Sequence, residues 1–241
     1  MEESQALCRV EVTEFRLRLA RALRPGETPQ LRGFFGQRFI EEVLLHHHLA
    51  DGSLLYTYPR VQFKIVDTTG LLVGVAEGSS LLSKLWLDVE ETIIGTEQLP
   101  VLEASIHRRL DVLGDTTDPV DYRFVTPWLA LNQDNARRYW RLPSRAQRVA
   151  LLERILVGNC LSLAKSFGHT VRRTLRGDCR ELEEMHCTLK GVPMIGFLGT
   201  FRINFLVPNH FGLGKSVSRG FGTVEQIAGE RHRRDTCSSR T

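Results

Sequence analysis

Apolar and polar residues follow regular patterns through the first half of the chain. They mostly alternate from Val10 to Leu19, which is typical of a half-buried strand. From Gln30 to His47 the apolar residues recur every three or four positions and form one face of a helix. Two further runs, Val61–Val66 and Leu71–Val75, flank a turn at residues 67–70 and predict a hairpin.

The rest of this half extends the pattern. Ser79 and Ser80 are suitable N-caps for a short helix, and extended segments follow around residues 92–95 and 99–113. The predicted order is strand, helix, two strands, helix, strand. This is the order of a ferredoxin-like domain.

The second half repeats part of this order after Gly114–Pro119, which we interpret as a linker. The strand predicted at Tyr122–Leu131 contains Pro127, which an edge or a bulge tolerates. A helix at 144–167 and two strands at 170–189 and 194–207, with a turn at Lys190-Gly191, complete this half. We therefore predict an α+β fold with two tandem ferredoxin-like domains, residues 1–114 and 120–228, and a basic disordered tail at 229–241.

Charge separates the two halves. Residues 121–241 contain 20 Lys/Arg and 10 Asp/Glu, a net charge of +10, whereas residues 1–120 have a net charge of −6. A basic half suits a polyanion such as RNA or DNA, although a solvated basic surface explains the charge equally well. The arginine pairs Arg137-Arg138 and Arg172-Arg173 are candidates for phosphate contacts.

Other features of the composition narrow the class of protein. The five cysteines are scattered and include no C-x-x-C pair, which favours a reducing compartment over a disulfide framework. The sequence shows no secretory signal and no apolar run long enough to cross a bilayer. We expect a cytoplasmic protein that does not bind membranes.

A glycine-rich segment near the C-terminus is the strongest local motif. Residues 212–222 read GLGKSVSRGFG. Glycines permit positive φ and close backbone approach, and the loop's N–H groups can bind an anion, although a hairpin that only turns a corner is the alternative. The candidate RNA-binding residues are Gly212, Gly214, Lys215, Arg219, Gly220 and Gly222, with Phe211 or Phe221 as a base-stacking ring.

A nucleotide-binding P-loop is disfavoured for the same segment. Residues 214–216 match the end of the motif, but Asn209 stands where its first glycine should be. The lysine should also begin a helix, and the glycines that follow Lys215 prevent one.

Three consecutive histidines, residues 46–48, lie near the expected end of the first helix. Histidines can transfer the protons when a 2′-hydroxyl attacks its own phosphate, and a cation such as Lys64 would stabilise the transition state. His46 and His48 share a face only where the backbone is extended, because residues two apart on a helix point about 200° apart. A metal site lacks a suitably spaced fourth ligand, and surface histidines at a helix end are the other alternative.

Taken together, these motifs resemble the CRISPR-associated endoribonucleases of the RAMP superfamily that mature guide RNA, and within them the subgroup lettered b. The resemblance rests on the glycine pattern at 212–222, on LRGFFG at 31–36, on the histidine cluster and on YPRVQFK at 58–64. It implies metal-independent cleavage of CRISPR repeat RNA that leaves a 5′-hydroxyl and a 2′,3′-cyclic phosphate or 3′-phosphate. It implies His46 and His48 as the catalytic pair and Tyr56 as an auxiliary residue, with no cofactor and no metal.

The alternative is a catalytically silent RNA-binding subunit of a CRISPR effector complex, with the same fold and loop. The sequence leaves open whether the chain binds other effector subunits or forms a homodimer.

Overall fold

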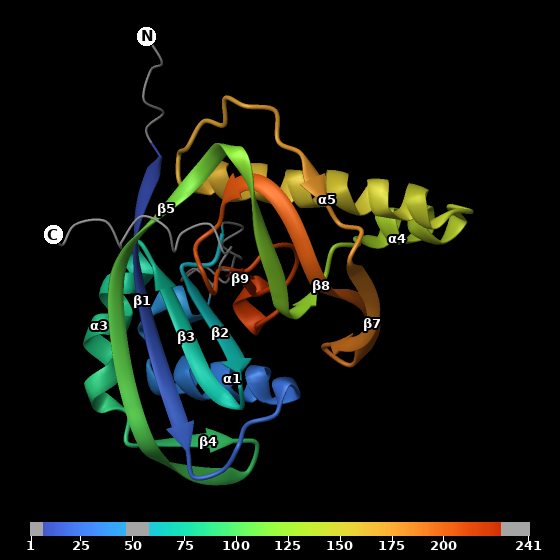
Figure 1. The fold of residues 1–241 in the computed structure, drawn as a ribbon. Coiled ribbons are helices and arrows are strands. Elements are labelled where there is room, and N and C mark those ends of the chain that lie inside the picture. The colour runs from blue at the N-terminus through green and yellow to red at the C-terminus, as the bar shows by residue number, and fades with distance from the viewer. Residues whose placement is uncertain (1–6, 47–57, 228–241) are drawn as a thin grey trace, which may run out of the picture.

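The computed structural model describes residues 7–46 and 58–227, without the side chains of His46 and Asp88. Its strands pair in antiparallel fashion, and the helices cover them (Figure 1). No helix within the described ranges is long and apolar enough to span a bilayer.

The first half contains a four-stranded sheet in the order β2-β3-β1-β5. The helices α1 and α3 pack on one face of it, and the βαββαβ order is that of a ferredoxin-like domain, as predicted. Its elements are β1 (Cys8–Leu19), α1 (Thr28–Arg38), α2 (Val43–His46), β2 (Val61–Val66), β3 (Thr69–Val75), α3 (Glu77–Leu85) and β4 (Glu91–Ile94).

The second half has the same strand arrangement with one helical element replaced. The final part of β5 lies between β8 and β9, and β6 and β7 pair with the other edge of β8. Between β8 and β9, where a ferredoxin-like domain has its second helix, the described chain has the glycine-rich segment instead. The elements are β5 (Glu97–Trp128), α4 (Gln133–Arg141), α5 (Arg145–Ser166), β6 (Gly177–Asp178), β7 (Leu182–Leu189), β8 (Val192–Leu206) and β9 (Val224–Gln226).

The strand β5 joins the two halves. It pairs with β1 up to Leu113 and with β8 from Gly114 onward. The segment interpreted as a linker, residues 114–119, is therefore part of this strand, with an irregular register between Asp115 and Val120. An edge or a bulge was expected to accommodate Pro127, and the register of β5 does shift between residues 124 and 128.

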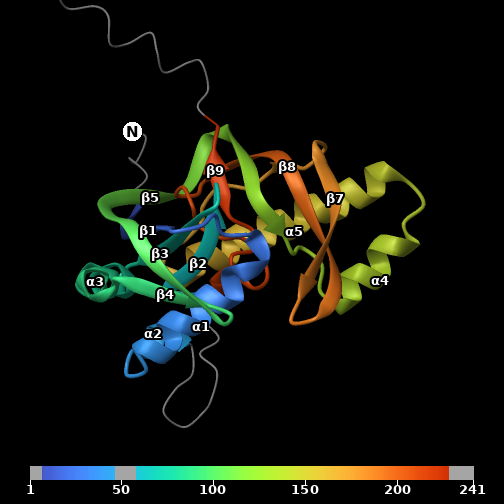
Figure 2. The ribbon, with the colours of Figure 1, turned by 90° about the horizontal axis from the view of Figure 1, so that it is seen from below.

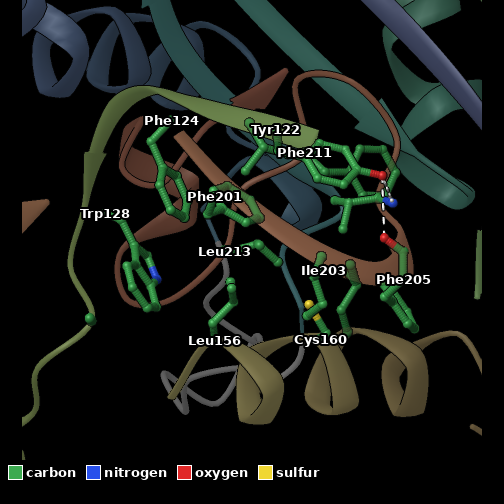
Figure 3. Close-up of a cluster of buried hydrophobic side chains, with 14 of the residues drawn as sticks. Tyr122, Phe124, Trp128, Leu156, Cys160, Phe201, Ile203, Phe205, Phe211 and Leu213 are labelled. Carbon is green, nitrogen blue, oxygen red and sulfur yellow. Dashed lines mark hydrogen bonds between the residues drawn. The ribbon is translucent and has the colours of Figure 1, made fainter. Parts of the chain in front are cut away.

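Two hydrophobic cores lie on opposite faces of the first sheet. One is formed with α1 and α3 and includes Phe15, Phe35 and Phe63. The other joins the sheet's second face to the second half of the chain, where side chains from β5 and β8 point toward Leu156 and Cys160 of α5 (Figure 3). Since both faces are covered, every residue of β2 is buried.

The helix predicted at 30–47 is interrupted. It ends at Arg38, Phe39 has non-helical angles (φ −118°, ψ 58°), and α2 starts at Val43. The break buries Leu45 and leaves Ile40 71% exposed, so the regular apolar spacing did not reveal where the chain turns.

Two further differences fall in the second half. The helix α4 was not predicted, because Tyr139 is its one buried residue and it has no apolar face. In the strand predicted at 170–189, only residues 177–178 and 182–189 are extended in ladders. Before residue 177, side chains rather than a neighbouring strand accept hydrogen bonds from the backbone. Asp115 accepts from the N–H of Arg173 (3.1 Å), and Asn204 accepts from the N–H of Arg176 (2.7 Å).

The second-half helix and hairpin agree with the sequence analysis. Ser144 caps α5 by accepting from the N–H of Gln147, and the helix runs to Ser166. The strands β7 and β8 turn at Lys190 and Gly191, which both have positive φ.

Candidate functional site

The glycine-rich segment, residues 212–222, is a closed loop between β8 and β9, and we refer to it as the glycine loop. Gly212 forms a bridge with Thr223, and the N–H of Leu213 donates to the carbonyl of Gly222 at 2.9 Å. Positive φ occurs at Gly214 (87°), Gly220 (87°) and Gly222 (66°), which confirms the expectation for these three glycines.

Other atoms of the protein occupy the space that a side chain would need at several of these glycines. A Cβ at Gly222 would lie 1.9 Å from the carbonyl oxygen of Leu213, and one at Gly212 would lie 2.4 Å from Val217. A Cβ at Gly214 would lie 2.6 Å from Nε1 of Trp128. The expected close approach of the backbone therefore occurs against other parts of the protein, and it gives the loop one packed shape.

The strand β2 and the residues before it hold the loop at both ends. The hydroxyl of Tyr58 donates to the carbonyl of Gly212 (3.1 Å), and the N–H of Gly212 donates to Oε1 of Gln62 (3.1 Å). At the other end, Nζ of Lys64 donates to Oγ1 of Thr223 (3.1 Å). The YPRVQFK segment thus anchors the glycine loop to the first half of the protein.

Lys64 is not at the surface. Its side chain is 0% exposed, and burial, opposed by the carboxylate of Glu14, lowers its pKa to about 7. From this position its ammonium contacts the base of the loop, and reaching an RNA phosphate would require the loop to move away.

The charged residues of the loop differ in exposure. Lys215 is exposed and Arg219 is half-buried. Burial and the nearby charge of Arg219 lower the pKa of Arg32 on α1, so two guanidinium groups lie close together here. Like charges held near each other attract an anion. Sequence reasoning missed Arg32, although it lies within the LRGFFG motif.

The aromatic residues of the loop also differ. Phe211 is fully buried against Tyr58 and Phe167, so it is not available to stack on a base. Phe221 is half-buried.

A cleft of about 870 Å³ opens beside the loop. One wall is the loop from Gly212 to Ser218, and the other is the C-terminal part of α5. Leu44 and Tyr58 also line it, and these residues lie just before and just after residues 47–57. Described residues close to both ends of the histidine-bearing segment therefore line this cleft. Its polar lining residues include Asn159, Ser162, Lys165, Ser166, Ser216 and Ser218.

Of the predicted catalytic residues, His46 is described in its backbone only, at the last described position of α2. His48 and Tyr56 lie outside the described residues, as does the predicted tail at 229–241. The backbone between His46 and His48, on which their sharing a face depends, is likewise outside them.

Arg60 is a cation at the cleft that the sequence analysis did not select. Its Nη2 donates to the carbonyl of Ser166 (3.0 Å), its Nε pairs with Glu77 (3.1 Å), and its guanidinium lies over the ring of Phe167. Its Nη1 is buried without a hydrogen-bond partner among the described residues. The arginine thus ties the first half to α5 and keeps one donor unused beside the cleft.

The predicted phosphate-binding pairs do not line the cleft. Arg137 and Arg138 lie on α4, and Arg172 and Arg173 lie on the segment after α5, where Arg173 is 3.9 Å from Asp115. All four arginines are exposed, and α5 separates the two pairs along the chain.

His210, directly before the loop, has an internal role. Its Nδ1 lies 2.6 Å from Glu14 and its Nε2 lies 3.1 Å from Glu225. Burial alone would raise the pKa of Glu14, but the hydrogen bond and charge of His210 and the charge of Arg109 lower it to about 2. This network joins β1 to the chain on either side of the loop.

Comparison with known proteins identifies the family. The model of the Cas6b N-terminal domain matches residues 8–110, and that of the Cas6b C-terminal domain matches residues 114–227. An uncharacterized protein of Methanocaldococcus jannaschii is 34% identical over 146 residues, which cover 61% of this chain and 99% of that protein.

Solved structures match the same family. A crystal structure of Cas6b is 34% identical, with a TM-score of 0.86 over 91% of this chain and 100% of that one. A structure of a CRISPR RNA processing endoribonuclease, also named Cas6b, is 32% identical, with a TM-score of 0.73 and the same coverage. The two family models together span nearly all described residues, and the chain belongs to the Cas6b family.

Proposed function

We propose that this protein is a metal-independent endoribonuclease that cuts CRISPR repeat RNA at the cleft beside the glycine loop. The observation that supports this most is the meeting at one cleft of the glycine loop and both described ends of the histidine-bearing segment. Membership of a family that includes a CRISPR RNA processing endoribonuclease supports the substrate.

The proposed reaction needs two proton transfers. His46 and His48 act as base and acid: one removes the proton of the 2′-hydroxyl, and the other protonates the departing 5′-oxygen. The 2′-oxygen bonds to phosphorus as the bond to the 5′-oxygen breaks, which gives a 2′,3′-cyclic phosphate and a 5′-hydroxyl. Tyr56 is the auxiliary residue.

The glycine loop and its anchors orient the RNA. Lys215 and Arg219, with Arg32 near Arg219, attract phosphates to the loop. We assign Lys64 to holding the loop at Thr223, because its ammonium is buried there. The protein works in the cytoplasm, where the RNA is transcribed.

Single-turnover cleavage of a repeat RNA in EDTA tests the proposal. His46→Ala and His48→Ala should each slow cleavage by about 100-fold or more while RNA affinity stays unchanged. His186→Ala is the matched control, because His186 is exposed on β7. Tight RNA binding by the wild-type protein with no cutting between pH 6 and 8 would instead indicate a silent RNA-binding subunit.

A further inference from the structure

The helix α4 carries an exposed face that the cleft does not use. Arg137, Arg138, Trp140 and Arg141 are all exposed, and together we refer to them as the basic face of α4. At 100° per residue these four positions span roughly 160° of the helix surface, on the side opposite Tyr139.

The structure fixes this face toward solvent. Tyr139 is buried, its hydroxyl donates to Glu184 at 2.7 Å, and its ring contacts Phe197. Asn132 caps the helix by accepting from the N–H of Asn135 (2.7 Å). Because Tyr139 must point inward, its neighbour Trp140 points outward and is 51% exposed.

The indole of Trp140 is already positioned by its surroundings. The ring of Tyr139 meets it edge to face at 5.3 Å, and the guanidinium carbon of Arg148 lies 5.7 Å from its centre. An exposed aromatic ring held in this way can stack on a base with little further ordering.

The charge around this ring is strongly positive. Residues 133–148 contain five arginines and one acidic residue, Asp134. Asp134 lies 3.6 Å from Arg137, but both side chains are largely exposed, so this pair neutralises little. Arginines around an exposed indole match the alternating phosphates and bases of single-stranded RNA.

The basic face lies away from the cleft. The C-terminal part of α5 lines the cleft, whereas α4 precedes the N-terminal end of the same helix, on the opposite side of the molecule from α1 and α2 (Figure 2). The first residue of α5 at the cleft is Asn159, which lies about 21 Å along the helix from Arg145. RNA in contact with both regions must therefore extend several nucleotides beyond the bond in the cleft.

We propose that the basic face of α4 is a second RNA-binding site that holds a single-stranded stretch of the substrate, with a base stacked on Trp140 and phosphates paired with the surrounding arginines. The proposal rests on the proposed function in that the RNA held here is the one cut in the cleft.

The test compares Trp140→Ala, Trp140→Phe and the wild-type protein on two RNAs: a full repeat, and a short fragment around the cleavage position. Met185→Ala, which removes another exposed apolar side chain, is the control. Trp140→Ala should weaken binding of the full repeat by about tenfold, because base–aromatic stacking contributes at this level. Trp140→Phe should restore most of the affinity. Binding of the short fragment, and cleavage of the full repeat at saturation, should stay unchanged.

Equal affinity of Trp140→Ala and wild type for the full repeat would overturn the inference, as would an equal loss on both RNAs. If Trp140→Ala binds the full repeat as tightly as wild type but no longer retains a protein that wild type retains from cell extract, the face contacts a protein instead of RNA. Wild-type cleavage is measured in the same series. If the wild type cuts RNA and Trp140→Ala binds the full repeat normally, this inference alone fails. If the wild type binds RNA without cutting it and Trp140→Ala weakens binding of the full repeat only, the proposed catalysis alone fails.

Discussion

The glycine loop contacts the rest of the protein along most of its length, whereas α4 has a single buried residue, Tyr139. In the loop, Gly214 lies against Trp128 and Gly220 against Phe63, and directly after it Thr223 bonds to Lys64. The arginines of α4 instead extend into solvent. Both regions carry positive charge, but only the loop depends on exact packing for its shape.

This difference separates two kinds of RNA contact. A substitution within the loop should change its structure and, through it, the cleft. A substitution on the exposed face of α4 should leave the fold intact and change affinity alone. Substitutions in the two regions should therefore have different effects on stability and on RNA binding.

The largest effect is expected at Gly222. In Gly222→Ala the new Cβ would overlap the carbonyl of Leu213 at a positive φ. We expect a loss of about 3 kcal/mol in the free energy of unfolding, with RNA binding weakened as well, measured by urea denaturation and a binding titration.

Gly158→Ala on α5 is the matched control for this change. An added Cβ there meets no atom within 4 Å, so the variant should gain about 0.5–1 kcal/mol from its better helix propensity. Equal stability of the two variants would contradict the packed loop.

Lys64 should make stability depend on pH near neutrality. Its pKa falls from 10.5 to about 7 on folding, so above pH 7 the unfolded state binds the extra proton and stability rises with pH. Lys64→Met removes this effect. Between pH 6 and pH 9 the free energy of unfolding of the wild type should therefore rise, relative to that of Lys64→Met, by more than about 1.4 kcal/mol. This figure corresponds to a pKa shift of one unit.

The same variant separates two roles of Lys64. A positioning role predicts weaker RNA binding with the cleavage rate at saturation little changed. A lysine that contacts the scissile phosphate would instead slow cleavage at saturation and leave binding intact.

Glu14 should also make stability rise with pH, but in the acid range. Its pKa is lowered to about 2, so its contribution is complete above pH 4.5 and is lost as the pH falls toward 2. Wild-type stability should drop over this interval by about 2 kcal/mol more than that of Glu14→Gln. Parallel acid-unfolding curves for the two proteins would show that the His210 and Arg109 contacts do not hold the carboxylate charged.

The smallest effect is expected on α4. Arg137→Gln should reduce the slope of log K against log salt by about 1 and leave stability within about 0.5 kcal/mol of wild type. Arg18→Gln, at an exposed arginine of the first sheet, is the control and should leave the slope unchanged. A stability loss in Arg137→Gln comparable to that of Gly222→Ala would remove the contrast between the two regions.

The fold was largely predictable because most strands alternate regularly and Ser144 marks the start of α5. The breaks were not predictable from periodicity: residues 31–45 keep helical spacing through a turn at Phe39 that tertiary packing imposes. The helix α4 was not predicted because it has no apolar face. Its N-cap Asn132, Asp134 in its first turn and the arginines of its last turn are nevertheless recognisable helix signals.

The site was predictable in outline and less so in detail. The glycine pattern indicated the loop, but the roles of Tyr58, Gln62 and Lys64 as anchors depend on the second half covering the sheet. The sequence predicted β2 as one strand of a hairpin, and its spacing did not indicate that both of its faces would be buried. Arg60 gave no signal beyond its place in the YPRVQFK segment.

The chemistry of the RNA ends distinguishes attack by the 2′-hydroxyl from metal-dependent hydrolysis. A repeat RNA is incubated with the wild-type protein in EDTA, and the products are analysed by mass spectrometry. Attack by the 2′-hydroxyl predicts a 5′-hydroxyl on one product and a 2′,3′-cyclic phosphate or 3′-phosphate on the other, with no cutting when that 2′-hydroxyl is replaced by hydrogen. A 5′-phosphate with a 3′-hydroxyl, or loss of cutting in EDTA, would exclude metal-independent attack by the 2′-hydroxyl.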